Sequence, residues 1–194
     1  MRDRWLWVLA ALALVVGGFV FAVGRVNTGD PICELGEPLC ELALPLRHDD
    51  IIRQQAERHD IDPALIAGVI FTESRFRDQT SHAGARGLMQ ITPDTADTIE
   101  NLSGGETFVF EDLANPDLNI RYGTYYLNYL LDLYGGNVVA ALAAYNSGPG
   151  NVDAWGGSEL EVEDIEFPET RTYVEDVLER RDEYAKNYEE ELGL

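Results

Sequence analysis

The sequence predicts a mainly α-helical protein. Apolar residues recur at spacings of three and four over several long segments, as they do on the buried face of a helix. Two segments open with Asp62-Pro63 and Thr92-Pro93, pairs that are typical of a helix start. Strand and helix patterns do not alternate along the chain, so a parallel sheet with crossover helices is not expected.

Residues 1–25 are predicted to form a membrane anchor or a signal sequence. Residues 5–23 carry no charge, with Arg2 and Arg4 before them and Arg25 after them. A helix of this length nearly spans the ~30 Å apolar layer of a bilayer. The run exceeds the about 7–15 apolar residues of a cleaved signal, which favours a single-pass anchor, although small residues at 22 and 24 leave cleavage and secretion open. The charge balance predicts that the rest of the chain lies outside the cytoplasm.

Residues 26–46 are predicted to form a linker, because they are rich in turn-forming and acidic residues and lack a sustained period. Cys33 and Cys40 lie in this segment, seven positions apart. Two thiols without a nearby histidine do not form a zinc site. Outside the cytoplasm a small disulfide loop is expected, and two free thiols are the alternative.

Residues 47–194 are predicted to form one domain. Helices are expected over 48–59, 63–75, 92–100, 117–134, 137–144 and 169–192. Residues 101–115 are expected to form a loop or a small strand pair, and 146–150 a glycine-rich turn. The last helix should bury one face, which carries Tyr173, Val174, Val177, Leu178, Tyr184 and Tyr188.

Composition and missing motifs exclude several classes of function. With 14 basic and 35 acidic residues the net charge is −21, so binding to nucleic acid is not expected. His48, His59 and His82 are scattered without a metal-ligand spacing, so no metal site is predicted. The chain has no phosphate-binding loop, dinucleotide fingerprint or serine-hydrolase elbow, and no cofactor is expected.

Glu73 is the first candidate catalytic residue. In the helix predicted from Pro63 it follows Ile66 and Ile70 at helical spacing, which places its carboxyl on the apolar face. Burial there would favour the protonated acid, which can give a proton to a leaving oxygen. The alternative is that Glu73 ends the helix and turns outward to water.

Two small-residue segments are candidate binding loops. The segment 81–90 contains Ser81, Met89 and Gln90, and its glycines permit a close approach of backbone to a ligand. The alternative is a tight connection with Met89 packed in the core. The segment 143–150 pairs the hydroxyl of Tyr145 with the amide of Asn146, and a buried structural tyrosine is an equal interpretation.

Together these segments resemble the transglycosylase SLT domain, the catalytic module of soluble lytic murein transglycosylases. Four blocks match in order: ESRF at 73–76, GLMQITPDTA at 87–96, AYNSGPG at 144–150 and FPETRTYV at 167–174. The similarity extends over roughly residues 48–188. The resemblance implies a goose-lysozyme-like fold, no cofactor, and the glycan strands of peptidoglycan as the binding partner, whereas partners in a cell-wall machinery stay unknown.

The resemblance also implies a mechanism and a set of site residues. Glu73 would be the sole catalytic carboxylate, protonating the oxygen between N-acetylmuramic acid and N-acetylglucosamine. The substrate's acetamido group would support the cationic centre, and the muramic acid 6-hydroxyl would then close a 1,6-anhydro ring. Ser81, Met89, Gln90, Tyr145 and Asn146 would contact the glycan, and Glu169 would brace the site.

Small departures from the family pattern remove no catalytic part. Glu166 stands where relatives usually have proline, Ser147 replaces a common alanine, and the stretch between Glu73 and Gln90 is one residue shorter than in many relatives. Two rival functions remain. One is a goose-type muramidase, which would use the same glutamate with a water molecule. The other is a non-catalytic glycan-binding module, against which the intact Glu73, Gln90 and Tyr145 argue.

Overall fold

The computed structural model describes residues 33, 36–102 and 109–194. The predicted anchor or signal at 1–25 and most of the predicted linker before residue 36 lie outside the described residues, as do positions 103–108 of the predicted loop or strand pair. Among the helices that the structure describes, none is both long and apolar enough to cross a membrane. The described part is helical, as the sequence predicts, with only isolated β-bridges.

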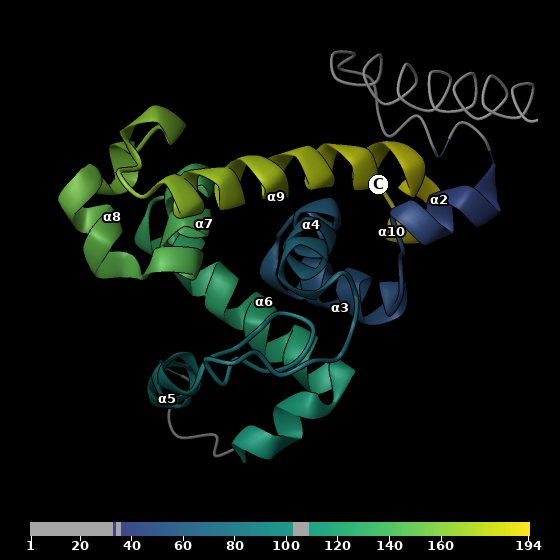
Figure 1. Ribbon diagram of the computed structural model, residues 1–194, viewed down its shortest axis with the longest axis horizontal. Coiled ribbons are helices and arrows are strands. Elements are labelled where there is room, and N and C mark those ends of the chain that lie inside the picture. The colour runs from purple at the N-terminus through teal and green to yellow at the C-terminus, as the bar shows by residue number, and fades with distance from the viewer. Residues whose placement is uncertain (1–32, 34–35, 103–108) are drawn as a thin grey trace, which may run out of the picture.

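Two helices in contact form the centre of the domain. Helix α4 (Pro63–Ser74) is buried on all sides over residues 64–71, and α9 (Pro168–Asn187) lies across it (Figure 1). A Cβ atom on Gly68 would lie only 2.9 Å from the carbonyl oxygen of Val177. Glycine at position 68 therefore permits the close approach of the two backbones.

Other helices surround this pair. Helix α3 (Asp49–His59) packs against α4 and α6 (Pro116–Leu133), and α7 (Val138–Ser147) packs against both α6 and α9. Side-chain caps fix several starts: Asp62 accepts a hydrogen bond from the amide of Ala64 (2.8 Å), and Asn137 accepts one from Ala140 (3.1 Å). Helix α5 (Pro93–Leu102) and the 3₁₀ turn η3 (Phe110–Ala114) lie on either side of positions 103–108.

The segment after α7 differs from the predicted turn at 146–150. Helix α7 continues to Ser147, and α8 (Pro149–Trp155) begins after Gly148 alone, whose φ is 89°. Pro149 starts this helix because its missing N–H is not needed in a first turn. Two 3₁₀ turns, η4 (Gly157–Glu159) and η5 (Val162–Asp164), then lead to α9. The last predicted helix is also divided, since α9 ends before Tyr188 and α10 (Glu189–Leu192) follows.

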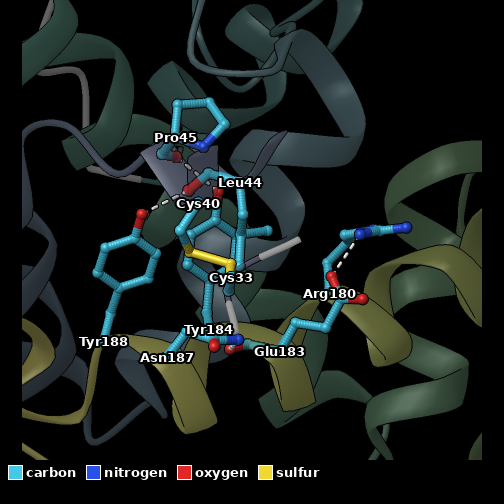
Figure 2. Close-up of a disulfide and its surroundings, with 9 residues drawn as sticks. All are labelled: Cys33, Cys40, Leu44, Pro45, Arg180, Glu183, Tyr184, Asn187 and Tyr188. Atoms are coloured by element: carbon cyan, nitrogen blue, oxygen red, sulfur yellow. Dashed lines mark hydrogen bonds and ion pairs between the residues drawn. A yellow bond between two sulfur atoms is a disulfide. The ribbon is translucent and has the colours of Figure 1, made fainter. Parts of the chain in front are cut away.

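The second half of the predicted linker is helical rather than irregular. Residues Glu37–Ala43 form helix α2, and Leu44 is fully buried. The hydroxyl of Tyr184 donates to the carbonyl oxygen of Pro45 (2.6 Å), and that of Tyr188 donates to Leu44 (2.7 Å). Figure 2 shows these tyrosines of the C-terminal region reaching the segment beside the disulfide. The residues that follow α2 are therefore attached to the C-terminal region of the domain.

Cys33 and Cys40 are joined by a disulfide, with Cys40 buried in the core (Figure 2). Replacing Cys33 with serine and Cys40 with alanine is expected to lower the free energy of unfolding by about 2 kcal/mol, because the bridge restricts the unfolded chain. Urea unfolding of the full chain in mild detergent measures the change. A reductant should destabilise the natural protein to the same extent and leave the variant unaffected; equal unfolding midpoints of the oxidised protein and the variant would contradict the expectation.

Candidate active site

Glu73 lies in the last turn of the buried helix α4. The helix ends at Ser74, and Arg75 and Phe76 then turn the chain with φ values of 52° and 58°. The Glu73 side chain is half-buried and lines a groove, rather than turning away into water. Burial raises the pKa of its carboxyl from 4.5 to about 7, because a low-dielectric environment disfavours the charged form. At neutral pH a large share of the molecules therefore hold the acid in its protonated form.

This groove has a volume of about 260 Å³. Five of the predicted site residues line it: Glu73, Ser81, Gln90, Tyr145 and Asn146. The lining also includes five residues that were not predicted as site residues: Ala85, Ile91, Thr92, Thr95 and Tyr126. Among the described residues that line the groove, Glu73 is the only carboxylate.

The loop between α4 and α5 forms one side of the groove and is shaped by its own polar groups. The Ser81 hydroxyl oxygen accepts a hydrogen bond from the amide of Ala85 (3.0 Å). The side-chain amide of Gln90 donates to the carbonyl oxygens of Gly87 (2.7 Å) and Gln79 (3.1 Å). Gln90 itself has a left-handed backbone, with φ of 45°. Ser81 and Gln90 thus both line the groove and hold the loop that forms it.

The structure does not place Met89 where the resemblance implied, because its side chain is fully buried and does not line the groove. Its backbone serves the site instead: the carbonyl oxygen accepts the Tyr145 hydroxyl (2.9 Å), and its amide donates to Asn119 (2.7 Å). The side chain of Asn119 is buried in α6 and also donates to the carbonyl oxygens of Arg86 (2.9 Å) and Leu113 (3.0 Å). Asn119 therefore holds the loop against α6, which the sequence pattern did not predict.

Tyr145 stands beside the catalytic candidate, at the end of α7. Burial, and then the negative charge of Glu73, raise the pKa of its phenol well above the ordinary value. Its ring lies 5.7 Å from that of Tyr126, centre to centre. The phenol is therefore neutral at every working pH, with its proton directed to the Met89 carbonyl. It supplies a fixed wall of the groove and no charge.

The FPETRTYV block contributes through residues other than the expected one. Glu169 is exposed in the first turn of α9 and does not line the groove. Its neighbour Thr170 is buried and donates a hydrogen bond to the side-chain oxygen of Asn146 (2.8 Å). Acidic residues are favoured in a first helical turn, where they face the positive end of the helix dipole. Thr170 therefore holds the side chain of Asn146 in place, and Glu169 lies outside the groove.

Tyr173, one turn further along α9, is a site residue that sequence reasoning missed. Its buried hydroxyl approaches the Glu73 carboxyl and offsets part of the rise in the pKa of Glu73, although it does not reach ordinary hydrogen-bond geometry. Burial and the charge of Glu73 raise the pKa of Tyr173 well above its ordinary value. Its helical spacing with Val174 and Val177 predicted only a core position, because such spacing does not show what lies opposite a hydroxyl.

The raised pKa of Glu73 predicts a pH-dependent difference in stability between the natural protein and a Glu73→Gln variant. Below pH 4.5 the carboxyl is protonated in both the folded and the unfolded state, so its burial does not lower the free energy of unfolding. Between pH 4.5 and about 7 only the unfolded state loses the proton, so the unfolding free energy falls as pH rises. The variant should become more stable than the natural protein by about 3 kcal/mol above pH 7. Urea unfolding at pH 4 and pH 8 tests this, and an equal difference at the two pH values would contradict it.

A buried helical centre that ends in one protonatable glutamate at a polar groove defines a lysozyme-like domain. The structure of the 70 kDa soluble lytic transglycosylase from Escherichia coli has the same fold, with a TM-score of 0.71 and 33% sequence identity. The match covers 76% of this chain and 25% of that one.

Residues 50–168 match the family model of the transglycosylase SLT domain, so the chain belongs to that family. The soluble lytic murein transglycosylase of Salmonella typhimurium is 37% identical over 143 residues, covering 69% of this chain and 22% of that protein. The membrane-bound lytic murein transglycosylase C of Histophilus somni is 38% identical over 118 residues, covering 55% and 32%. The chain thus spans between a fifth and a third of the length of these relatives.

Proposed function

We propose that the protein is a lytic transglycosylase that cleaves the β-1,4 bond between N-acetylmuramic acid and N-acetylglucosamine in peptidoglycan. The observation that carries this proposal is Glu73, whose half-buried carboxyl has a pKa raised to about 7 at the groove. An acid poised near neutral pH can donate a proton and then take one back. The names of the relatives supply the substrate class.

In the first step Glu73 protonates the glycosidic oxygen. The bond from that oxygen to C1 of muramic acid breaks, and positive charge develops on the sugar ring. Hydrolases that form a covalent intermediate use a second carboxylate about 5 Å from the acid. The described lining of the groove holds no second carboxylate. The 2-acetamido group of the substrate takes that part in this proposal, as the family resemblance implies.

In the second step the Glu73 carboxylate takes the proton of the muramic acid 6-hydroxyl. The 6-oxygen then bonds to C1, which closes a 1,6-anhydro ring and returns Glu73 to its protonated form. No water is consumed. The attacking hydroxyl belongs to the same sugar, so the step gains from proximity. Gln90, Asn146 and the ring of Tyr126 line the groove where the strand would lie.

The remaining parts of the chain fit an enzyme that works outside the cytoplasm. Residues 1–25 would be the membrane anchor, or a signal that is removed; 26–46 the connection with its disulfide; and 47–194 the catalytic domain. The Cys33–Cys40 bridge supports an oxidising compartment, because reduced thiols prevail in the cytoplasm. The substrate is found in the same compartment.

Mass spectrometry of the products tests the proposal. Purified peptidoglycan is incubated with the full chain in mild detergent, and with the Glu73→Gln variant as the blank. Muropeptides lighter by one water than their hydrolytic counterparts, released only by the natural protein, are the expected result. Hydrated reducing ends would identify a muramidase instead. Strand binding without release of any product would identify a glycan-binding module.

A further inference from the structure

The aromatic surface of the groove continues beyond it along helix α6. Tyr126 lines the groove, and its ring lies 5.7 Å from that of Tyr145, centre to centre. The ring of Tyr129, which does not line the groove, lies 6.2 Å from that of Tyr126, with 22° between the two planes. The three rings therefore form a connected row that begins in the groove and ends outside it.

The exposure of the side chains increases along this side of α6. Tyr126, Tyr129 and Leu133 follow one another at spacings of three and four, so they lie on one face of the helix. Tyr126 is 6% exposed, Tyr129 is half-buried and Leu133 is 47% exposed. From Tyr126 to Leu133 the helix rises about 10 Å. We call these three residues the α6 stripe.

Helix α3 lies against a neighbouring side of α6 and not against the stripe. The ring of Tyr125 lies 6.2 Å from that of His59 in α3, and the negative charge of Asp132 opposes the fall in the pKa of His59 that burial causes. Positions 125 and 132 thus share the face that is turned toward α3. Tyr126 and Leu133 each follow one of these positions by one residue, about 100° further around the helix.

The α6 stripe has the chemistry that binds sugar rings. Each ring of a β-1,4 glycan presents C–H groups on its two faces and polar groups around its rim. A tyrosine ring offers a flat apolar surface for such a face and a hydroxyl for the rim. The stripe carries no charge, although the chain has a net charge of −21, so it favours a neutral ligand over an ionic one.

The groove is too small for a polymer, so a bound strand must continue over the surface beside it. The groove volume of about 260 Å³ is below the about 300–1,000 Å³ of ordinary ligand pockets. Apolar residues that are exposed singly need no explanation, whereas an apolar surface that continues a binding groove marks an extension of the site. The stripe begins at Tyr126 in the groove lining and meets this condition.

We propose that the glycan strand leaves the groove along the α6 stripe, with one sugar ring packed on Tyr129 and the next toward Leu133. This assignment rests on the proposed function and extends it. Tyr129 is then a binding residue outside the site of proton transfer, and it makes affinity depend on the length of the strand. Strands that reach Tyr129 bind more tightly than strands that fill the groove alone.

Calorimetric titration tests the proposal in the Glu73→Gln variant, which binds a strand without cleaving it. The protein is the full chain in a mild detergent without a sugar headgroup, and the probes are β-1,4-linked N-acetylglucosamine oligomers of two and six sugars. The hexasaccharide should bind more tightly than the disaccharide. Adding Tyr129→Ala should weaken hexasaccharide binding about tenfold and leave disaccharide binding within about twofold, because only the longer ligand reaches the ring.

Two results of this titration would overturn the proposal. One is a hexasaccharide affinity that does not change in Tyr129→Ala. The other is an equal loss of affinity for both oligomers, because Tyr129 would then shape the groove and not touch the extended strand.

Three further variants separate strand contact from folding. Tyr129→Phe keeps the ring and should keep hexasaccharide affinity within about threefold. Tyr125→Ala is the matched control, since it removes a half-buried ring of the same helix that is turned toward α3, and it should change neither affinity. Leu133→Ser changes an exposed position and should weaken hexasaccharide binding about threefold. It tests the stripe even if Tyr129→Ala does not fold.

Light scattering of the same proteins tests the other occupant of the stripe, a second copy of this chain. The proposal expects the same oligomeric state in the natural protein, Tyr129→Ala and Leu133→Ser. A dimer that these changes convert into a monomer, with hexasaccharide affinity unchanged, would assign the stripe to an interface between copies.

Strand cleavage separates this proposal from the proposed function. With Glu73 intact, Tyr129→Ala should raise the KM for peptidoglycan strands about tenfold and leave kcat within about twofold, as expected when binding is lost equally in the ground and transition states. Hexasaccharide binding that depends on Tyr129, without cleavage of any strand, would remove the proposed function and leave the α6 stripe in place. Cleavage with a KM that Tyr129→Ala does not change would give the reverse.

Discussion

Replacing Glu73 with glutamine is expected to lower the rate of glycan-strand cleavage by about 10²–10⁴-fold, the usual contribution of a general acid and base. Glutamine has almost the same shape, but it can neither give a proton to the glycosidic oxygen nor take one from the 6-hydroxyl. The described groove lining holds no other carboxylate to replace it. The measurement is the initial rate of release of soluble muropeptides at pH 6, where the natural acid is mostly protonated.

Glu169→Gln is the matched control for this experiment. It makes the same chemical change at a glutamate that the family resemblance places in the site and the structure places outside the groove. The structure predicts a rate within about twofold of the natural rate, because Glu169 does not line the groove. Its loss from an exposed first turn should lower the free energy of unfolding by only about 0.3–1 kcal/mol. A loss comparable to that of Glu73→Gln would show that Glu169 reaches the substrate. Strand binding by the Glu73 variant should persist, because its groove is unchanged.

The sequence was sufficient to predict the element that carries the catalytic candidate. Asp62 and Pro63 define the start of α4, and the spacing of Ile66, Ile70 and Glu73 predicts the apolar environment that raises the pKa of the acid. These signals are local, within a few turns of one helix. Predictions from such local patterns hold in the folded protein because capping and burial depend on the same few residues.

The features that sequence reasoning missed depend on contacts between distant residues. Helix α2 is too short to show a period, and its attachment rests on Tyr184 and Tyr188, 139 and 144 residues away from the carbonyl groups they reach. Tyr173 carries the pattern of a core residue, and only the packing of α9 on α4 brings its hydroxyl toward Glu73. No spacing along the chain could predict these pairs.

The groove depends on a series of contacts from the loop to α6 and α7. Gly87 precedes the residues whose backbone groups meet Asn119 and Tyr145, and it adopts φ of 78°, in the left-handed region. A Cβ atom at position 87 would lie 2.2 Å from the side-chain nitrogen of Asn119 and 2.5 Å from the carbonyl oxygen of Leu113. Asn119 is itself held by three hydrogen bonds, so it has little freedom to move away.

Gly87→Ala is therefore expected to lower the free energy of unfolding by about 3 kcal/mol or more, combining left-handed strain with the steric conflict. Cleavage should fall as well, because displacement of this loop moves the Met89 carbonyl and Gln90. Gly84→Ala is the matched control: Gly84 has φ of 83°, but a Cβ there would meet no atom within 4 Å. It should cost about 1 kcal/mol from backbone strain alone. Urea unfolding of both variants separates the backbone strain from the steric conflict. Equal losses of unfolding free energy would show that the contact with Asn119 does not fix the loop.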